Sequence, residues 1–310
     1  MRLLAVAFGA VALAAGATAA APRVHLPRDH FGHDAGIEWW YVTADVRGGD
    51  GARYSVFFTL FKRGGLVLPV SQVVNLSTGA IVAHSERLVP ARIGSTGLRF
   101  ESSVAELVYE QASNIWAAAA KSAGYALRFR AHPEKPYVLH GGGTGMIRQG
   151  PKSSAYYSAT RMSVRGNLVA GGRSTAFAGT GWLDHQWGNF AADQRARSWD
   201  WFSCRFDDRT ELMLYSFRDG HRNGTYVDRQ GRGRRVGGFE SAAGARALRA
   251  AGKEWPLDWT VRVSSPRLSL SLHSLAPDQL VRGTVLPTFW EGASAVSGSK
   301  HGTCFVEETS

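Results

Sequence analysis

Cysteine is scarce in this sequence, which has two, Cys204 and Cys304, in 310 residues. Because the two lie far apart along the chain, they form neither a C-x-x-C redox motif nor a metal-binding cluster. A disulfide between them is compatible with an oxidising compartment, but the sequence does not show that their segments meet. The sequence also lacks a G-x-S-x-G elbow, an H-E-x-x-H motif and a phosphate-binding glycine loop. These absences exclude the common serine-hydrolase, metalloprotease and nucleotide-binding templates.

Long apolar segments are absent except at the N-terminus, where the chain begins MRLLAVAFGAVALAAGATAAAP. Arg2 supplies an early positive charge, residues 3–15 are apolar, and residues 17–19 are small enough for a cleavage site. The apolar run is too short and too rich in alanine to span a bilayer comfortably. We therefore expect a cleaved signal peptide over residues 1–20 and a soluble mature protein that is periplasmic or secreted.

Acidic residues are outnumbered, with 25 aspartates and glutamates against 36 lysines and arginines, and the formal net charge is +11. Arginine is densest in RDGHRNGTYVDRQGRGRR, residues 218–235. An exported protein rarely meets nucleic acid, so we do not expect a nucleic-acid interface. An arginine-rich solvated loop in peripheral contact with anionic lipid headgroups is the preferred interpretation.

Helical periodicity is also scarce. Only residues 117–120 and 241–252 have a helical pattern, and each predicts a short surface helix. Short runs rich in tyrosine, tryptophan, phenylalanine and valine dominate instead, and glycine turns such as GGDG at 48–51 separate them. With 44% hydrophobic residues for a core, the chain is predicted to be all-β and antiparallel.

A weak internal repeat suggests two domains. Residues 37–65 and 198–220 each read as an aromatic strand, a polar turn, a second apolar strand, and then a basic residue and glycine. The offset matches one small barrel or sandwich, so we expect tandem β domains over residues 21–170 and 171–310. The run from Val56 to Phe61 is apolar on both faces, which predicts a strand covered on both sides.

The stretch GTGWLDHQWGNF at 179–190 places an Asp-His pair between two tryptophans. If it is extended, Leu183, His185 and Trp187 share one face, whereas Trp182, Asp184 and Gln186 share the other. A half-buried histidine that fills a β core is the plainest interpretation of His185.

Several longer motifs resemble a known family. They begin with PRDHFGHDAGIEWWYVTADV at 27–46 and continue through PYVLHGGGTGMIRQG, YYSATRM, GWLDHQWG, WPLDW, FWEGASAVSG and a closing GTCFVEET. The chain resembles the carotenoid 1,2-hydratase and AttH-like family of lipocalin-like proteins over nearly its whole mature length. Its closing segment departs from the family pattern at Cys304, where glycine is favoured, and at Glu308, where an apolar residue is favoured. The last strand is therefore either a sheet edge or a strand tethered to Cys204.

The resemblance implies two lipocalin-like β domains with an apolar pocket near the D-H-Q-W motif. The hydratase branch adds water to an isoprenoid double bond without a cofactor, which requires an acid, a π-face for the carbocation and a positioned water. The implied catalytic residues are Asp184, His185, Asp200 and Tyr215, with Asp219 as a further candidate. The implied ligand-binding residues are His33, Glu38, Trp40, Tyr41, Tyr157, Trp187, Trp199 and Trp201.

No cofactor or metal is expected. Asp29, His33, Glu38 and His185 have the chemistry of metal ligands, but no pair of them has ligand spacing on one element. The expected partner is an apolar small molecule or lipid, and a monomer is the simplest expectation. An exported protein is poorly placed to meet pigment precursors at the cytoplasmic membrane, so the carotenoid substrate is not carried over. Hydration and hydrolysis both remain open, and a non-catalytic lipid carrier or envelope-interaction protein is the alternative.

Overall fold

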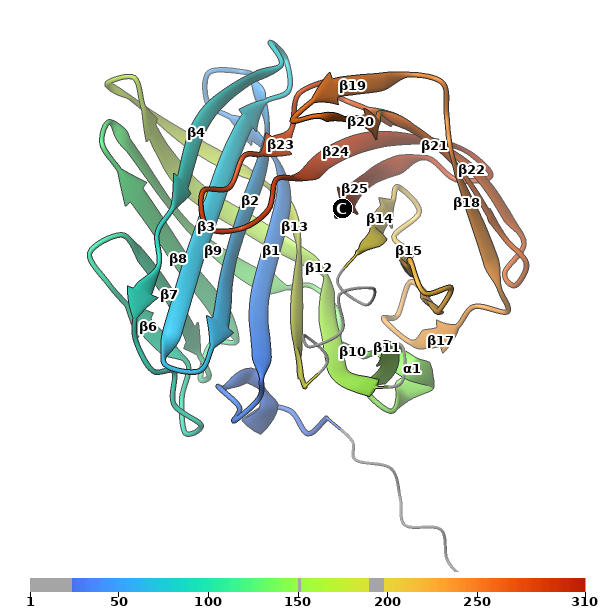
Figure 1. Ribbon diagram of the computed structural model, residues 1–310, viewed down its shortest axis with the longest axis horizontal. Coiled ribbons are helices and arrows are strands. Elements are labelled where there is room, and N and C mark those ends of the chain that lie inside the picture. The colour runs from blue at the N-terminus through green and yellow to red at the C-terminus, as the bar shows by residue number, and fades with distance from the viewer. Residues whose placement is uncertain (1–23, 150–151, 190–197, 310) are drawn as a thin grey trace, which may run out of the picture.

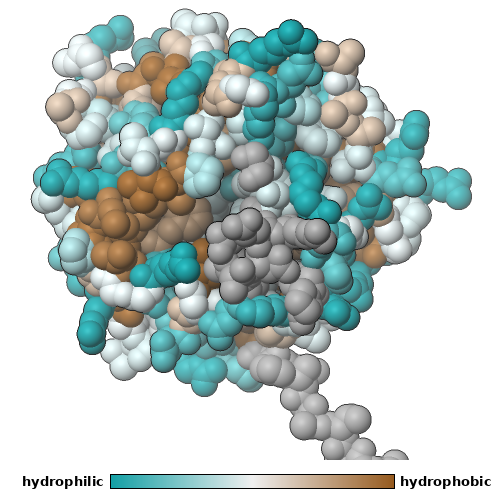
Figure 2. Space-filling model, viewed as in Figure 1, coloured by the Kyte–Doolittle hydropathy of each residue, from teal (hydrophilic) through white to brown (hydrophobic). Residues whose placement is uncertain are grey.

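The structure is a computed structural model that describes residues 24–149, 152–189 and 198–309. The segment expected to be a signal peptide lies outside these residues. The described chain is almost entirely antiparallel β, which confirms the predicted fold class. None of its helices has the length and apolarity needed to cross a membrane. Hydrophilic and intermediate residues cover most of the face in Figure 2, and the most extensive apolar patch lies on the side of the first sheet.

The described strands form two large sheets and one small hairpin (Figure 1). The first sheet contains β1 (Ile37–Gly48), β2 (Arg53–Arg63), β3 (Leu66–Asn75), β4 (Ala80–Glu86), β5 (Val89–Pro90), β6 (Arg99–Glu101), β7 (Ala105–Glu110), β8 (Ile115–Ser122), β9 (Tyr125–Pro133), β10 (Val138–Leu139), β11 (Met146–Gln149), β12 (Lys152–Ala170) and β13 (Arg173–Gly188). The second contains β14 (Trp199–Phe206), β15 (Glu211–Phe217), β16 (Arg222–Val227), β17 (Gly233–Arg235), β18 (Phe239–Ala243), β21 (Asp258–Val263), β22 (Leu268–Ser274), β23 (Leu280–Val281), β24 (Phe289–Gly298) and β25 (Gly302–Glu308). The hairpin is β19 (Ala247–Ala250) with β20 (Lys253–Pro256), and the single-turn helices are η1 (Arg28–His30) and α1 (His140–Gly143).

The strand order shows where one sheet gives way to the other. Along the first sheet the order is β4-β3-β2-β1-β13-β12-β9-β8-β7-β6, and along the second it is β17-β16-β15-β14-β25-β24-β22-β21-β18. The division expected at residue 170 falls between β12 and β13, which pair with each other in the first sheet. The change of sheet comes instead after Gly188 and before Trp199. In each sheet the first strand pairs with the last one, β1 with β13 and β14 with β25.

Each sheet encloses its own apolar cluster, and a third cluster lies between the sheets. Strand β2 shows how one strand serves two clusters. Val56 and Phe58 point into the first sheet's interior, whereas Phe57 packs in the cluster between the sheets. Both faces of this strand are covered, as its unbroken apolar run predicts. Figure 1 shows the second sheet as a half-barrel whose β14 and β25 lie beside β1, β12 and β13.

Both predicted helices are wrong. Residues 117–120 lie in β8, and residues 241–252 are divided among β18, β19 and the turn into β20. In β8, Ala118 and Ala120 are buried in the first sheet's interior, with the intervening alanines on the other face. Pairing with β7 and β9 satisfies the backbone of this segment and outweighs the helical preference of alanine.

A disulfide joins Cys204 and Cys304, which are directly opposite each other on β14 and β25. Strand β25 lies between β14 and β24, so it is not a sheet edge. Of the two alternatives for the last strand, the structure therefore has the tethered one. Both sulfurs are buried in the second sheet's interior.

Candidate active site between the two sheets

The alternation of β13 divides the residues predicted for one site into two groups. Trp182 and Asp184 face the second sheet, and Trp182 packs in the cluster between the sheets. Leu183 belongs to the first sheet's interior, and Trp187 packs against that interior beside His185. The two faces are those that an extended strand predicts. As a result Asp184 and His185, adjacent in sequence, lie in different environments.

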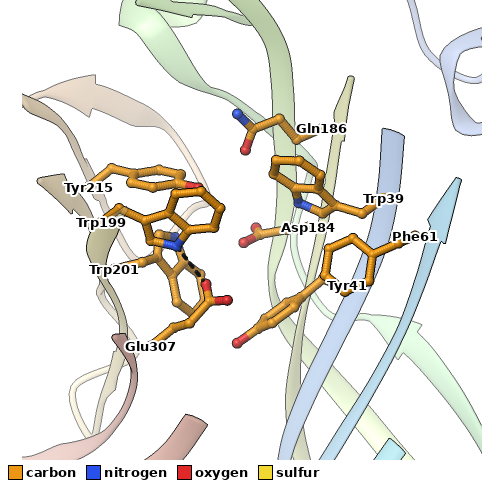
Figure 3. Close-up of a pocket in the computed structure, with 9 residues that line it drawn as sticks. All are labelled: Trp39, Tyr41, Phe61, Asp184, Gln186, Trp199, Trp201, Tyr215 and Glu307. Carbon is orange, nitrogen blue, oxygen red and sulfur yellow. Dashed lines mark hydrogen bonds between the residues drawn. The ribbon is translucent and has the colours of Figure 1, made fainter. Parts of the chain in front are cut away.

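A narrow cleft separates the two sheets beside Asp184 and has a free volume of about 20 Å³. Figure 3 shows its two walls, with Asp184 on the wall of the first sheet and Glu307 on the wall of the second. The lining residues are Trp39, Tyr41, Phe61, Asp184, Gln186, Trp199, Trp201, Tyr215 and Glu307. Most of the lining is therefore aromatic, and two carboxyl groups stand within it.

Asp184 is buried and holds its position through three donors. Tyr156 Oη donates to it at 2.8 Å, Trp182 Nε1 donates at 2.6 Å, and Ser158 Oγ also donates. Burial raises the pKa of Asp184 to about 7, although the three hydrogen bonds lower it. The donors stabilise the carboxylate form, and the pKa lies near neutrality, so this group can accept a proton in the cleft.

Ser158 is in turn held by His140. His140 Nε2 lies 2.7 Å from Ser158 Oγ, and His140 Nδ1 lies 2.9 Å from Thr225 Oγ1 on the second sheet. Since Ser158 donates to Asp184, Nε2 donates to Ser158 and Nδ1 accepts from Thr225. Burial lowers the pKa of His140 to about 3, which keeps the ring neutral. Gly141, at φ +66°, permits the tight turn after His140, because a Cβ there would meet the Met146 carbonyl oxygen at 1.8 Å.

Glu307 faces Asp184 from the other wall. Trp199 Nε1 donates to one of its oxygens at 3.0 Å, and burial raises the pKa of Glu307 to about 7. Glu291 lies directly opposite Glu307 on β24 and accepts a hydrogen bond from Tyr41 Oη at 2.5 Å. Burial and the charge of Glu307 raise the pKa of Glu291 well above its usual range. A proton is therefore retained among these carboxyl groups near neutral pH.

Aromatic rings enclose the two acids. Tyr41 meets Trp201 edge to face at 5.2 Å between centroids, and Trp39 stacks with Trp199 at 6.3 Å. Tyr215 packs edge to face against Trp199 at 5.7 Å. The electron-rich faces of such rings stabilise positive charge that develops beside them. The cleft thus combines proton donors and acceptors with a surface suited to a carbocation.

His185 lies in a separate buried network inside the first sheet. Its Nε2 is 2.9 Å from Glu38 Oε1, its Nδ1 is 3.2 Å from Tyr157 Oη, and its ring stacks on Trp40. Burial lowers the pKa of His185, although Glu38 raises it. The predicted ligand-binding residues Glu38, Trp40 and Tyr157 are therefore grouped around this histidine and not around the cleft.

The same network includes the group considered for a metal. Ligand atoms of His33, Glu38 and His185 lie within 4.8 Å of one another. Lys62 Nζ already donates to Glu38 at 2.9 Å, and His33 Nδ1 lies 2.7 Å from the same carboxylate. These hydrogen bonds lower the pKa of Glu38 and account for the cluster. His33 also stacks on Trp187 at 3.9 Å between centroids. Asp29 accepts hydrogen bonds from Arg28 and from the backbone of His25, and it lies 3.7 Å from His33 Nε2.

Asp200 lies in a third place. Trp199 and Trp201 point into the cleft, so Asp200 between them points to the second sheet's interior. Its two oxygens accept hydrogen bonds from Arg218 at 2.7 and 2.8 Å. Asp219 pairs with the exposed His221 at 3.1 Å. Of the predicted catalytic residues, the structure therefore brings Asp184 and Tyr215 into the cleft and places His185 and Asp200 elsewhere.

The sequence matches a known protein family over nearly its whole length. A family model described as AttH-like matches residues 17–310. The chain belongs to the AttH-like family. The resemblance inferred from the motifs is thereby confirmed.

Two solved structures share this AttH-like fold. A protein described as AttH from Nitrosomonas europaea is 23% identical, with a TM-score of 0.83 over 94% of this chain and 98% of that one. Kievitone hydratase from Nectria haematococca is 18% identical, with a TM-score of 0.79 over 94% of each chain. At these identities the likeness shows the fold alone. No curated protein matches the chain by sequence.

Several residues of the cleft and its support were not predicted from the sequence, among them Glu307, Glu291 and Tyr156. Each glutamate follows two apolar residues in a strand, in FVEET and FWEGAS, and a carboxyl group there signals a buried acid. Tyr156 stands beside Tyr157, which was selected although it points to the opposite face. In the β12–β13 register Tyr156 lies opposite Gln186, which shares a face with Asp184. Alternation along the paired strands therefore places Tyr156, and not Tyr157, on the face of Asp184.

Proposed function

We propose that this AttH-like protein adds water to a carbon–carbon double bond of an apolar ligand held between the two sheets. The observation that carries the proposal is the pairing of Asp184 and Glu307 across an aromatic cleft. Both carboxyl groups have a pKa raised to about 7, so one protonated and one ionised group coexist near neutral pH. This is the state that acid-base addition of water requires.

The two acids take different roles because their surroundings differ. Asp184 accepts three hydrogen bonds, which favour its ionised form, whereas the described side chains give Glu307 one, from Trp199. Glu307 therefore donates its proton to one alkene carbon. The other carbon becomes cationic beside Trp201 and Trp199, water forms a bond to it, and Asp184 takes the proton that this water releases. Proton transfer from Asp184 to Glu307 through solvent restores the starting state.

The ligand is an isoprenoid or unsaturated acyl lipid in this proposal, and the protein works after export. The aromatic lining of the cleft supports an apolar ligand. The N-terminal residues have the pattern of a signal peptide. Kievitone hydratase, which shares the fold, is a hydratase by name. Hydration is preferred over hydrolysis because the cleft pairs a proton donor with π-faces that suit a cation.

Turnover of short isoprenoid alcohols in heavy-oxygen water tests the proposal. With geraniol and farnesol as probes, mass spectrometry of the wild-type reaction should show a product heavier by one labelled water. Glu307→Gln and Asp184→Asn should each reduce the rate by about a hundredfold or more. Glu308→Gln and Asp200→Asn are matched controls, because each removes a buried acid that faces the second sheet's interior.

The controls should keep at least most of the wild-type rate. Probes that bind but are never hydrated by the wild-type protein would favour the non-catalytic carrier. Equal loss in all four variants would show that the cleft acids have no special role.

A further inference from the structure

Arg205 is a buried cation at the interface between the sheets. Its side chain is on the face of β14 that carries Trp201, and the residue is 3% exposed. None of its three guanidinium nitrogens has a hydrogen-bond partner among the described residues. The ring of Phe305 lies 5.6 Å from the guanidinium carbon, which compensates only part of the lost hydration.

The acids near Arg205 are already paired with other cations. Glu211 accepts hydrogen bonds from Lys135 at 2.8 Å and from Arg161 at 2.6 Å. Asp45 accepts two from Arg53 and one from Thr303. Four cationic side chains therefore share two carboxylates. This part of the interface therefore has more cationic than anionic side chains, and Arg205 is the cation that no carboxylate of the described residues bonds.

Two buried hydroxyl groups of the described chain belong to the same part of the interface. Thr43 Oγ1 and Ser203 Oγ have no hydrogen-bond partner among the described residues, and both residues are fully buried. Thr43 lies between Tyr41 and Asp45 on β1, and Ser203 lies between Trp201 and Arg205 on β14.

The contacts on either side bring these groups together. Tyr41 contacts Trp201. Four residues further along β1, beyond Thr43, comes Asp45, which bonds Thr303, the register partner of Arg205. Thr43 and Ser203 therefore lie on facing strands between these two contacts. Side chains on one face repeat about every 6.6 Å along a strand, so Ser203 is the neighbour of Arg205 on β14 and Thr43 is the neighbour of Asp45 on β1.

We propose that Arg205, Ser203 and Thr43 form a binding site for a small inorganic anion, with chloride as the occupant. The guanidinium offers charge and fixed donors, and each hydroxyl group can turn its hydrogen toward the anion. Removing an arginine from water without a counter-charge costs several kcal/mol, which a bound anion offsets. The full burial of Thr43 and Ser203 favours a monatomic ion over a larger oxyanion.

An anion at this place links the sheets, because Thr43 belongs to the first and Ser203 and Arg205 to the second. The proposal is independent of catalysis. The cleft is lined by Trp201 and not by Ser203 or Arg205, so the anion stabilises the arrangement without contacting the ligand. Anything that binds only the folded protein raises its unfolding temperature in a concentration-dependent way.

Thermal unfolding at fixed ionic strength tests the site, with sodium chloride replacing sodium gluconate stepwise. The wild-type unfolding midpoint should rise by about 3 °C as chloride passes tenfold above its dissociation constant. Arg205→Met, which keeps the length of the side chain, should abolish the dependence. Thr43→Val, a shape-matched change, should weaken chloride binding several-fold. The exposed Arg249→Met is the control and should respond like the wild type.

A second measurement keeps the test decisive if Arg205→Met does not fold. Crystals soaked in bromide should show an anomalous peak beside the Arg205 guanidinium, and Thr43→Val crystals should show a weaker one. A midpoint that ignores chloride at fixed ionic strength would mean that water alone fills the site and would overturn the proposal. Sulfate acting as well as chloride would overturn the monatomic occupant, and a chloride response that persists in Arg205→Met would place the anion elsewhere.

Discussion

At the scale of single residues, the buried carboxyl groups divide into those satisfied by cations and those satisfied by neutral donors. Asp200 pairs with Arg218, and Glu38 pairs with Lys62, so each of these buried carboxylates has a cationic partner. Asp184 and Glu307 receive hydrogen bonds from hydroxyl and indole groups instead. Burial without a cation is the physical cause of their raised pKa values. The acids in the cleft can therefore exchange protons near neutral pH. Their burial without a cation lowers the stability of the folded protein when they are ionised.

The stability cost of burying Glu307 without a cation leads to a prediction for Glu307→Gln. Burial raises the pKa of Glu307 from 4.5 to about 7, so the folded protein keeps a proton that the unfolded chain loses over this range. The resulting stability is present below about pH 4.5 and is lost as the pH rises through about 7. The free energy of unfolding of the Gln variant, relative to that of the wild type, should therefore increase by roughly 2 to 3 kcal/mol as the pH rises from about 4 to about 8. Urea unfolding of both proteins at the two pH values measures the difference.

Glu308→Gln is a second case on the same strand, because burial raises the pKa of Glu308 to about 8 and this variant should gain stability in the same direction. A pH-independent difference for Glu307→Gln would show that Glu307 ionises normally and would remove the proton donor from the mechanism. In the wild-type enzyme, turnover should also decline as the pH rises above about 7, because Glu307 loses the proton that it must donate.

At the scale of elements, β13 connects the two polar clusters without mixing them. Its register with β1 sets Asp184 opposite Tyr41 and His185 opposite Trp40. The first pair faces the second sheet, and the second pair faces the first sheet's interior. A strand that lies between two packed layers can thus hold a reactive acid on one side and a structural hydrogen-bond network on the other.

Adjacent substitutions on β13 should therefore have opposite effects. His185→Gln should lower the free energy of unfolding by about 1 to 3 kcal/mol, because Glu38 and Tyr157 lose buried hydrogen bonds to the ring. It should leave turnover nearly unchanged. Asp184→Asn should abolish most turnover with a smaller change in stability. Urea unfolding and geraniol hydration, measured on the same preparations, distinguish the loss of stability from the loss of turnover. A His185→Gln protein that is stable yet inactive would show that the histidine belongs to the active site.

Strand pattern explains how much of this was predictable from the sequence. Alternation on β13 and the two-sided apolar run of β2 follow from neighbouring residues, and both were predicted correctly. The helix predicted for the alanines of β8 was wrong because these residues form a strand only through pairing with β7 and β9. The approach of Glu307 to Asp184 depends on how two sheets pack, which no local pattern encodes. Hence Asp184 was identified from its motif, whereas its counterpart was missed.

At the scale of the whole molecule, the cleft exists only while the two sheets stay packed. The apolar cluster between them includes Trp39, Trp182 and Trp201. Polar contacts cross the same interface, among them Tyr41 to Glu291 and His140 to Thr225. Since the walls of the cleft come from different sheets, any loss of packing separates Asp184 from Glu307.

The strongest polar crossing is made by Glu211 of β15, which bonds to Lys135 and to Arg161 of β12. All three residues are buried, so Glu211→Gln leaves two cations without a counter-charge. Removal of one partner from a buried ion pair typically costs about 3 to 5 kcal/mol. We expect a loss of that size in urea unfolding, together with loss of turnover. The surface pair Arg249–Glu254 is the control, and Glu254→Gln should change stability by less than about 1 kcal/mol.

If the sheets form one cooperative unit, tryptophan fluorescence and circular dichroism should show coincident transitions in every variant. Two separated transitions in Glu211→Gln, with an unchanged first midpoint, would show instead that the sheets fold independently and that the cleft forms by docking of two finished domains.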